Sequence, residues 1–338
     1  MTVSAFISGC AGLDLGAEEI AFFRDARPWG FILFKRNCDT PEQIRRLTAS
    51  LRESVGRDAP ILIDQEGGRV QRLGPPHWPA YPTGRTYGAV FARDAAAGRR
   101  AVRLGARLMA EDLRALGIDV DCLPVLDVPV EGAHDVIGNR AYGVTADVVS
   151  VLGREAAAGL LEGGVLPVIK HIPGHGRAGV DSHHHLPVVD TAREILETTD
   201  FPPFRDAAEL PLAMTAHVVY SAIDPHAPAT TSRVVIDEVI RGLIGYDGCL
   251  MSDDVSMQAL SGDIAARTAA SLEAGCDLVL HCNGVLAEME AVAAACRPLT
   301  GRAAERAARA AAMRGGVVEI DVAAARDEFA RLTDGASV

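Results

Sequence analysis

The chain has 338 residues, of which 49% are hydrophobic and 23% are charged. This composition permits a large buried core and excludes a globally disordered protein. The formal net charge of −12 argues against a nucleic-acid-binding protein, which normally carries a basic patch. The negative net charge does not exclude an anionic small-molecule substrate, because a few local arginines and lysines can make the potential of one cleft positive.

Cysteine usage and hydropathy favour a cytoplasmic protein without a membrane segment. The seven cysteines are widely scattered and none stands in a Cys-x-x-Cys pair, so neither a disulfide framework nor a zinc knuckle is indicated. The first residues lack the basic and apolar regions of a secretion signal. No run of about 18 apolar residues could span a bilayer. We therefore expect a cytoplasmic protein with no cofactor and with neither a nucleic-acid nor a membrane partner.

Short apolar runs alternate with longer amphipathic patterns along the chain. The predicted strands are residues 5–10, 30–35, 60–65, 119–125, 166–171, 212–218, 249–253 and 278–282. Helical patterns lie between them, for example residues 41–55, 97–116, 145–162 and 263–274. Thr40 followed by Pro41 is the pattern of an N-cap with proline at the first helical position.

Eight strands that are mostly separated by helices predict a parallel sheet covered by helices. The count of eight favours a closed (β/α)₈ barrel of the TIM type over an open doubly wound sheet. No linker and no further repeat is evident. Residues 1–338 are therefore expected to form a single domain, with C-terminal helices from about residue 300.

Polar residues occur at or just after the C-terminal ends of six predicted strands. They are Asp64, Asp127, Lys170 with His171, His217, Asp253 and Asn283. The C-terminal ends of barrel strands converge on one face, where active sites are built. We therefore expect these side chains to meet in one site.

Residues 64–72 combine a carboxylate, a glycine pair and two arginines in the sequence DQEGGRVQR. Asp64 at a strand end can accept hydrogen bonds from hydroxyls, and an arginine fork can grip a carboxylate or a hydroxyl pair. The motif predicts a clamp for a polyol or a sugar. A turn held by salt bridges is the alternative reading.

The segment KHIPGHG at residues 170–176 is the most informative part of the chain. A core strand delivers Lys170 and His171 to its own end, and a loop rich in Gly and Pro then presents Asp181 and His183. Charged residues are rarely buried without a partner, and clustered ionisable groups mark functional sites. The segment therefore predicts an active-site loop.

Two further features carry weaker signals. Arg140 lies in a Gly-containing loop after the fourth predicted strand, where an arginine is usually just solvated. The seventh strand ends on Asp253 and Asp254. Successive strand residues point to opposite faces, so one carboxylate is expected to face the site and the other to support it or cap a helix. Both can instead be structural.

Two other chemistries compete for the same residues. The run His183-His184-His185 suggests a metal, but consecutive histidines cannot easily face one ion, and barrel metals usually take spaced ligands from different strands. We therefore expect no metal. Lys170 beside a histidine also fits a Schiff-base lysine, which needs desolvation to act as a nucleophile.

With these motifs in place, the sequence resembles the compact bacterial β-N-acetylglucosaminidases of glycoside hydrolase family 3. The resemblance covers almost the whole chain and rests on several motifs in the same order. They are residues 30–37 (GFILFKRN), 64–72, 170–176, 181–183 (DSH), 216–217 (AH), 252–257 (SDDVSM) and 274–277 (AGCD). Single-domain members of this family are (β/α)₈ barrels.

The resemblance implies a retaining mechanism with a covalent glycosyl-enzyme. Asp253 matches the family nucleophile, His183 matches the general acid/base of this subgroup, and Asp181 matches the residue that orients it. Most glycosidases use two carboxylates, but an imidazole titrates near neutral pH and can serve both steps. The positions that hold the N-acetylglucosamine ring in the family are matched by Asp64, Arg72, Arg140, Lys170 and His171.

The substrate that the resemblance implies is N-acetylglucosaminyl-1,6-anhydro-N-acetylmuramic acid, with or without its peptide, in bacterial cell-wall recycling. The partner is thus a small muropeptide or amino sugar, and a monomer or weak dimer is expected. A family 3 β-glucosidase and a catalytically silent sugar sensor are the alternatives. Two positions depart from the family pattern. Asn139 stands where the family often has Asp, so a charge partner for Arg140 is expected to be missing. His184 and His185 extend the histidine run, which makes it harder to assign His183 as the general acid/base from sequence.

Overall fold

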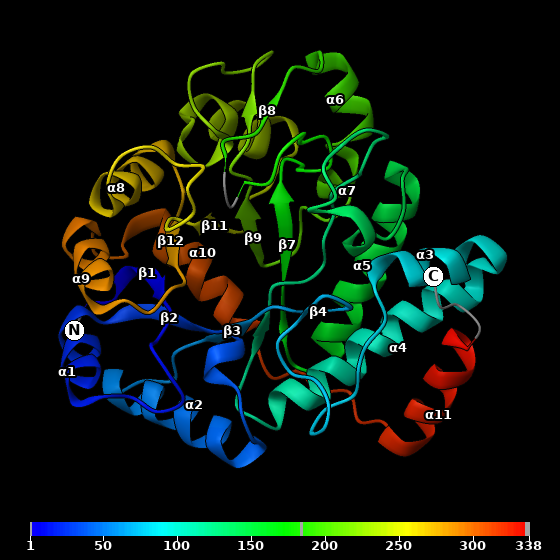
Figure 1. Cartoon of the computed structure of the whole chain (residues 1–338), viewed down its shortest axis with the longest axis horizontal. Coiled ribbons are helices and arrows are strands. Elements are labelled where there is room, and N and C mark those ends of the chain that lie inside the picture. The colour runs from blue at the N-terminus through cyan, green and yellow to red at the C-terminus, as the bar shows by residue number, and fades with distance from the viewer. Residues whose placement is uncertain (1, 183–184, 335–338) are drawn as a thin grey trace.

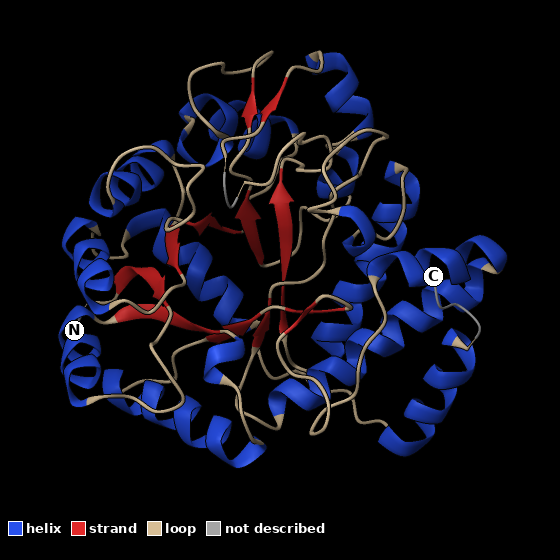
Figure 2. Ribbon diagram, in the orientation of Figure 1, coloured by secondary structure: helices blue, strands red, loops and turns tan. Residues whose placement is uncertain are grey.

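The computed structural model describes residues 2–182 and 185–334 (Figure 1). Eight parallel strands form a closed barrel, with strands at the centre and helices around them (Figure 2). The barrel strands are β1 (Ser4–Ser8), β2 (Pro28–Leu33), β3 (Ile61–Ile63), β6 (Val120–Asp121), β7 (Leu166–Ile172), β9 (Leu212–Thr215), β11 (Cys249–Asp254) and β12 (Leu278–His281). In sheet order β1 pairs with β2 and with β12, which closes the ring. The predicted (β/α)₈ barrel is confirmed.

Every predicted strand contributes to the barrel, but β6 is shorter than the predicted 119–125. Pro124 has no N–H to donate to a ladder. The chain beyond β6 nevertheless stays beside β7, because the Leu126 N–H donates to the Lys170 carbonyl at 2.7 Å. This irregular stretch brings Asp127 to the end of β7.

The four helices predicted at residues 41–55, 97–116, 145–162 and 263–274 are found within two residues of those bounds. The helices around the barrel are α1 (Ala17–Ala26), α2 (Pro41–Val55), α3 (Gly84–Arg93), α4 (Ala95–Arg114), α5 (Ala146–Glu162), α6 (Arg193–Thr199), α7 (Pro202–Arg205), the π-helix η4 (Val235–Leu243), α8 (Ile264–Ala274), α9 (Leu286–Ala295), α10 (Gly301–Ala312) and α11 (Val322–Thr333). The Thr40 hydroxyl accepts from the Gln43 N–H, which confirms the predicted cap of α2. In the described part of the chain, no helix has both the length and the apolar character to cross a membrane.

Two small sheets lie outside the barrel. The strands β4 (Gln65–Gly67) and β5 (Val70–Gln71) form an antiparallel ribbon directly after β3. The strands β8 (Val188–Val189) and β10 (Val219–Tyr220) pair in parallel. Both sheets follow C-terminal ends of barrel strands, so they extend the face where the pocket lies.

The barrel is filled by alternate residues of its strands. Ile32, Leu62, Val120, Val168 and Met214 belong to one buried cluster, and each is 3% exposed or less. Burying such a side chain contributes roughly 1.5–3 kcal/mol. The barrel is therefore a packed core, and a ligand can enter only at its ends.

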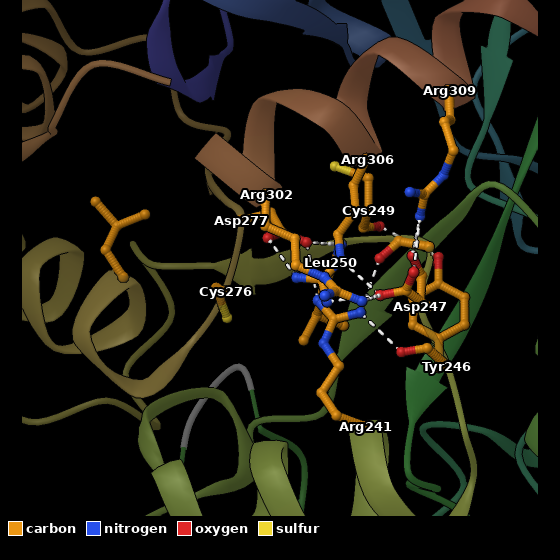
Figure 3. Close-up of polar contacts among 12 residues, drawn as sticks. Arg241, Tyr246, Asp247, Cys249, Leu250, Cys276, Asp277, Arg302, Arg306 and Arg309 are labelled. Atoms are coloured by element: carbon orange, nitrogen blue, oxygen red, sulfur yellow. Dashed lines mark hydrogen bonds and ion pairs between the residues drawn. The ribbon is translucent and has the colours of Figure 1, made fainter. Parts of the chain in front are cut away.

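At the opposite end of the barrel from the pocket, an ionic cluster fixes α10. Arg302, Arg306 and Arg309 of α10 all pair with Asp247, which precedes β11. Asp277, before β12, pairs with Arg306 at 3.1 Å (Figure 3). The three arginines lie four and three residues apart, so they project from one face of the helix. The C-terminal α11 continues from here to pack beside α4 (Figure 1).

Candidate active site

A pocket of about 300 Å³ opens at the C-terminal ends of the strands. Its polar wall is made by Asp64, Glu66, Arg72, Arg140, Lys170, His171, His175, Ser182, Asp253 and Asp254. Apolar side chains complete it, among them Phe34 at one side and Met214 and Leu280 at the strand ends. The pocket is thus concave and rich in charges, which is the setting of an active site.

Lys170 is the centre of a buried charge network. Its Nζ lies 2.9 Å from Asp64 Oδ1 and 2.7 Å from Glu66 Oε1, and its side chain is 2% exposed. Burial alone would lower the pKa of Lys170, but these two carboxylates raise it above its usual value. Lys170 is therefore a permanent cation, which disfavours the Schiff-base alternative because that chemistry needs a neutral amine.

The same two carboxylates hold the arginines of the pocket. Arg72 Nη2 lies 2.8 Å from Asp64 Oδ2, and Arg140 binds Glu66 through two parallel hydrogen bonds of 2.8 Å. Burial opposes ionisation of Glu66, but Arg140 and Lys170 lower its pKa to about 2. The expectation that Arg140 lacks a charge partner is wrong, because Glu66 pairs with it.

Asp127 lies beneath the pocket and organises both histidines of the KHIPGH segment. One of its oxygens accepts the backbone N–H groups of His171 at 3.1 Å and His175 at 2.7 Å, and the other lies 2.7 Å from His171 Nδ1. Burial opposes ionisation, but His171 and these bonds lower the pKa of Asp127 to about 2. An ionised Asp127 accepts a hydrogen bond from the Nδ1–H of His171, so Nε2 is the nitrogen left for the pocket.

Asp253 and Asp254 have different surroundings, although both line the pocket. The Asp254 carboxylate accepts hydrogen bonds from the Ser256 N–H, the Ser256 hydroxyl and the Cys282 N–H, so it ties β11 to the end of β12. The Asp253 N–H donates to Thr215 Oγ1 of β9, and Asp253 Oδ1 accepts from the Asp254 N–H at 2.8 Å. This division agrees with one supporting carboxylate and one carboxylate for the site.

The structure brings together six of the eight predicted site residues. Asp64, Arg72, Arg140, Lys170, His171 and Asp253 line the pocket. Asp181 immediately precedes Ser182, which lines it. His183 lies outside the described residues. Asn283 does not line the pocket as expected from its strand-end position, because its side chain accepts from the Val285 N–H just before α9 and donates to Glu288.

The sequence analysis did not assign a part in the site to Glu66, His175 or Ser182, which line the pocket. It also did not predict that Asp127 binds His171 and His175. Glu66 had a usable signal, because it stands two residues from Asp64 and so projects from the same side of an extended segment. Asp127 was noted at a strand end, but its contact with His171 depends on how the chain beyond β6 runs beside β7. In the described part of the chain, no group of three or more His, Cys, Asp or Glu residues is placed to hold a metal ion.

A closed parallel barrel whose strand ends carry a pocket of carboxylates and cations has the architecture of a barrel enzyme. Residues 18–314 match the glycosyl hydrolase family 3 N-terminal domain. The chain belongs to glycosyl hydrolase family 3, and it is an enzyme related to the β-hexosaminidases.

Individual relatives support this assignment. A β-hexosaminidase of Alkalilimnicola ehrlichii is 42% identical over 84% of this chain and 82% of its own, and one of Bordetella avium is 41% identical over 81% and 79%. The crystal structure of NagZ from Neisseria gonorrhoeae in complex with N-trifluoroacetyl-D-glucosamine superposes with a TM-score of 0.87. It is 31% identical, and the match covers 100% of this chain and 99% of that one.

Proposed function

We propose that this protein is a retaining exo-β-N-acetylglucosaminidase that removes terminal N-acetylglucosamine from peptidoglycan fragments during cell-wall recycling in the cytoplasm. The substrate class would be N-acetylglucosaminyl-1,6-anhydro-N-acetylmuramic acid with or without peptide. Residues 1–338 would act as one catalytic domain, as a monomer or weak dimer. The carrying observation is the charged pocket in which Asp64, Arg72, Arg140 and Lys170 surround a space beside Asp253.

The network of paired charges suits a sugar better than a free anion. Arg72, Arg140 and Lys170 are each paired with Asp64 or Glu66. Asp253 and Asp254 line the same pocket, so its wall holds four carboxylates against these three cations and does not favour a phosphate or carboxylate group. The remaining N–H and oxygen positions of these pairs can donate to and accept from hydroxyls, as a sugar ring requires. The neisserial relative, crystallised with an N-acylated glucosamine, supports an amino sugar as the occupant.

In the first step an Asp253 carboxylate oxygen would attack the anomeric carbon. The glycosidic bond breaks as the new bond forms, and its electron pair leaves with the aglycone oxygen, which takes a proton from His183. In the second step water attacks the same carbon, gives its proton to His183, and the bond to Asp253 breaks. Asp181 would orient His183. Together the two displacements retain the anomeric configuration.

The test compares an aryl N-acetyl-β-glucosaminide with the matching aryl β-glucoside, using Asp253→Ala and Asp254→Ala. We expect release from the N-acetyl substrate only, abolished by Asp253→Ala in a folded protein. An active Asp253→Ala beside an inactive Asp254→Ala would overturn the nucleophile. Equal activity on both glycosides would favour a β-glucosidase, and no activity on either would favour a sugar sensor.

A second test addresses His183. His183→Ala should lower turnover of glycosides with poor leaving groups far more than that of activated aryl glycosides, because the latter need little acid assistance. Equal losses on both substrates would show that His183 is not the acid.

A further inference from the structure

The first half of the loop after β7 is fixed to the barrel from several sides. The Tyr220 hydroxyl donates to the Gly174 carbonyl at 2.5 Å, and Arg177 Nε lies 2.7 Å from Asp200 Oδ2. The His175 N–H donates to Asp127 Oδ1 at 2.7 Å. Residues 174–177 are therefore held by contacts from three other parts of the chain, and they form a fixed base for the second half of the loop.

His175 connects this base to the second half of the loop. Its ring is buried, and its Nε2 lies 3.1 Å from the hydroxyl oxygen of Ser182. Its Nδ1 is buried and has no hydrogen-bond partner within the described residues. Burial and the neighbouring His171 lower the pKa of His175 to about 4, so its ring carries one proton at neutral pH.

The bare Nδ1 indicates where that proton lies. A buried N–H without an acceptor is rarer and more costly than an acceptor nitrogen without a donor. The proton therefore belongs on Nε2, which donates it to the Ser182 oxygen. The hydroxyl proton of Ser182 is then left for a second acceptor, and Ser182 lines the pocket.

We propose that His175 and Ser182 are positioning residues, and that their hydrogen bond holds the segment with Asp181 and His183 in register with the pocket. The inference rests on the proposed acid/base role of His183. Ser182 stands between those two residues in the sequence, so a displaced Ser182 displaces both neighbours. A displacement of about 1 Å can cost about a hundredfold in rate. In the first chemical step only the protonation of the leaving group depends on this register, because Asp253 is held by β11.

The experiment measures kcat/KM of Ser182→Ala on an activated dinitrophenyl and an unactivated phenyl N-acetyl-β-glucosaminide. This constant reports the first chemical step. We expect the phenyl substrate to lose at least about tenfold more than the dinitrophenyl substrate, which needs no acid. Ser182→Thr, which keeps a hydroxyl, should restore most of the difference.

Ser150→Ala is the matched control. Ser150 is 5% exposed and Ser182 is 4% exposed, but Ser150 lies in α5 and its hydroxyl has no hydrogen-bond partner among the residues that the structure describes. We expect no selective loss from this change. His175→Leu and His175→Gln give an independent pair, because only the glutamine can still donate to Ser182. The leucine variant should show the selective loss and the glutamine variant a smaller one, in proteins with similar melting temperatures.

Equal losses on the two substrates, or wild-type values for Ser182→Ala, would overturn the inference. A failure of the proposed function is distinguishable, since the wild type would then release neither aryl group, or Asp253→Ala would stay active. A selective loss in Ser182→Ala that Ser182→Thr does not relieve would also contradict a role for the hydroxyl.

Discussion

Glu66 offers a sharp test of how the pocket is held together. Its side chain is 3% exposed, and Oε1 lies 2.7 Å from Lys170 Nζ and 2.8 Å from Arg140 Nη2. With a pKa of about 2 it is ionised at neutral pH. Glu66→Ala removes a buried anion that bonds two buried cations. Lys170 keeps Asp64 as a partner, so most of the loss falls on Arg140, whose side chain is 11% exposed.

Breaking a buried ion pair by removing one partner costs about 3–5 kcal/mol. Glu66→Ala should lower the free energy of unfolding by that amount, and the whole free energy of unfolding of a typical protein is about 5–15 kcal/mol. Glu66→Gln keeps the volume and one acceptor, so it should lose about 1–3 kcal/mol. Urea unfolding measures both losses, provided that the m-value stays constant. Glu42→Ala is the control, because Glu42 is 67% exposed beside Arg45 and its removal should leave the free energy of unfolding nearly unchanged.

A double variant separates charge pairing from mere packing. In Glu66→Gln with Arg140→Met, the buried cation is removed along with its partner, so the double variant should be more stable than the sum of the single losses predicts. Additive losses would refute the reasoning, and so would a Glu66→Ala loss no larger than that of Glu42→Ala. All variants of Glu66 and Arg140 should have a reduced kcat/KM, because both residues line the pocket.

Two further predictions concern the loop after β7. A Cβ at Gly176 would lie 2.0 Å from the Val128 carbonyl oxygen, whereas a Cβ at Gly179 would meet nothing within 4 Å. Gly176→Ala should therefore lower the free energy of unfolding by about 1–3 kcal/mol and reduce activity. Gly179→Ala should change the free energy of unfolding by no more than about 0.5 kcal/mol. Equal melting temperatures of the two variants would contradict this prediction. The folded pKa of His175, about 4, lies below its ordinary 6.5. Its neutral form therefore contributes stability that is complete above pH 6.5 and is lost as the pH falls toward 4, in total about 3 kcal/mol. The stability difference between wild type and His175→Gln, measured by urea unfolding, should shrink over that range, and a constant difference would show that His175 is not the group responsible.

The barrel could be predicted from sequence because its signals are local. Each strand is a short apolar run. Thr40 and Pro41 mark the start of α2, where the Thr40 side chain accepts from the N–H of Gln43, three residues further along the chain. Strand ends were less certain. Residues 119–125 form one apolar run, yet Pro124 cannot donate to the ladder and only Val120–Asp121 is regular strand. The apolar pattern shows burial but not which backbone groups are paired.

The pocket could be predicted only in part, because its pairings are long-range. Arg140 and Glu66 are 74 residues apart, and no local feature of the Arg140 loop indicates that partner. Asn283 illustrates the opposite error. It stands at a strand end like Asp64, but it also stands two residues before Val285, and its side chain bonds that residue's N–H at the start of α9. A strand-end position places a residue at the active face, and competing local hydrogen bonds decide whether its side chain points into the pocket.

The proposed nucleophile and the proposed acid/base are held by different parts of the structure. Asp253 belongs to β11, and its backbone and side chain are fixed by Thr215 and by the Asp254 N–H. Ser182, which stands between Asp181 and His183 in the sequence, meets the fixed base at its bond with His175. A change on the strand should affect every substrate, whereas a change at that bond should affect substrates according to their leaving group. This contrast arises from geometry alone, and it makes leaving-group dependence the most direct measure of which half a substitution has disturbed.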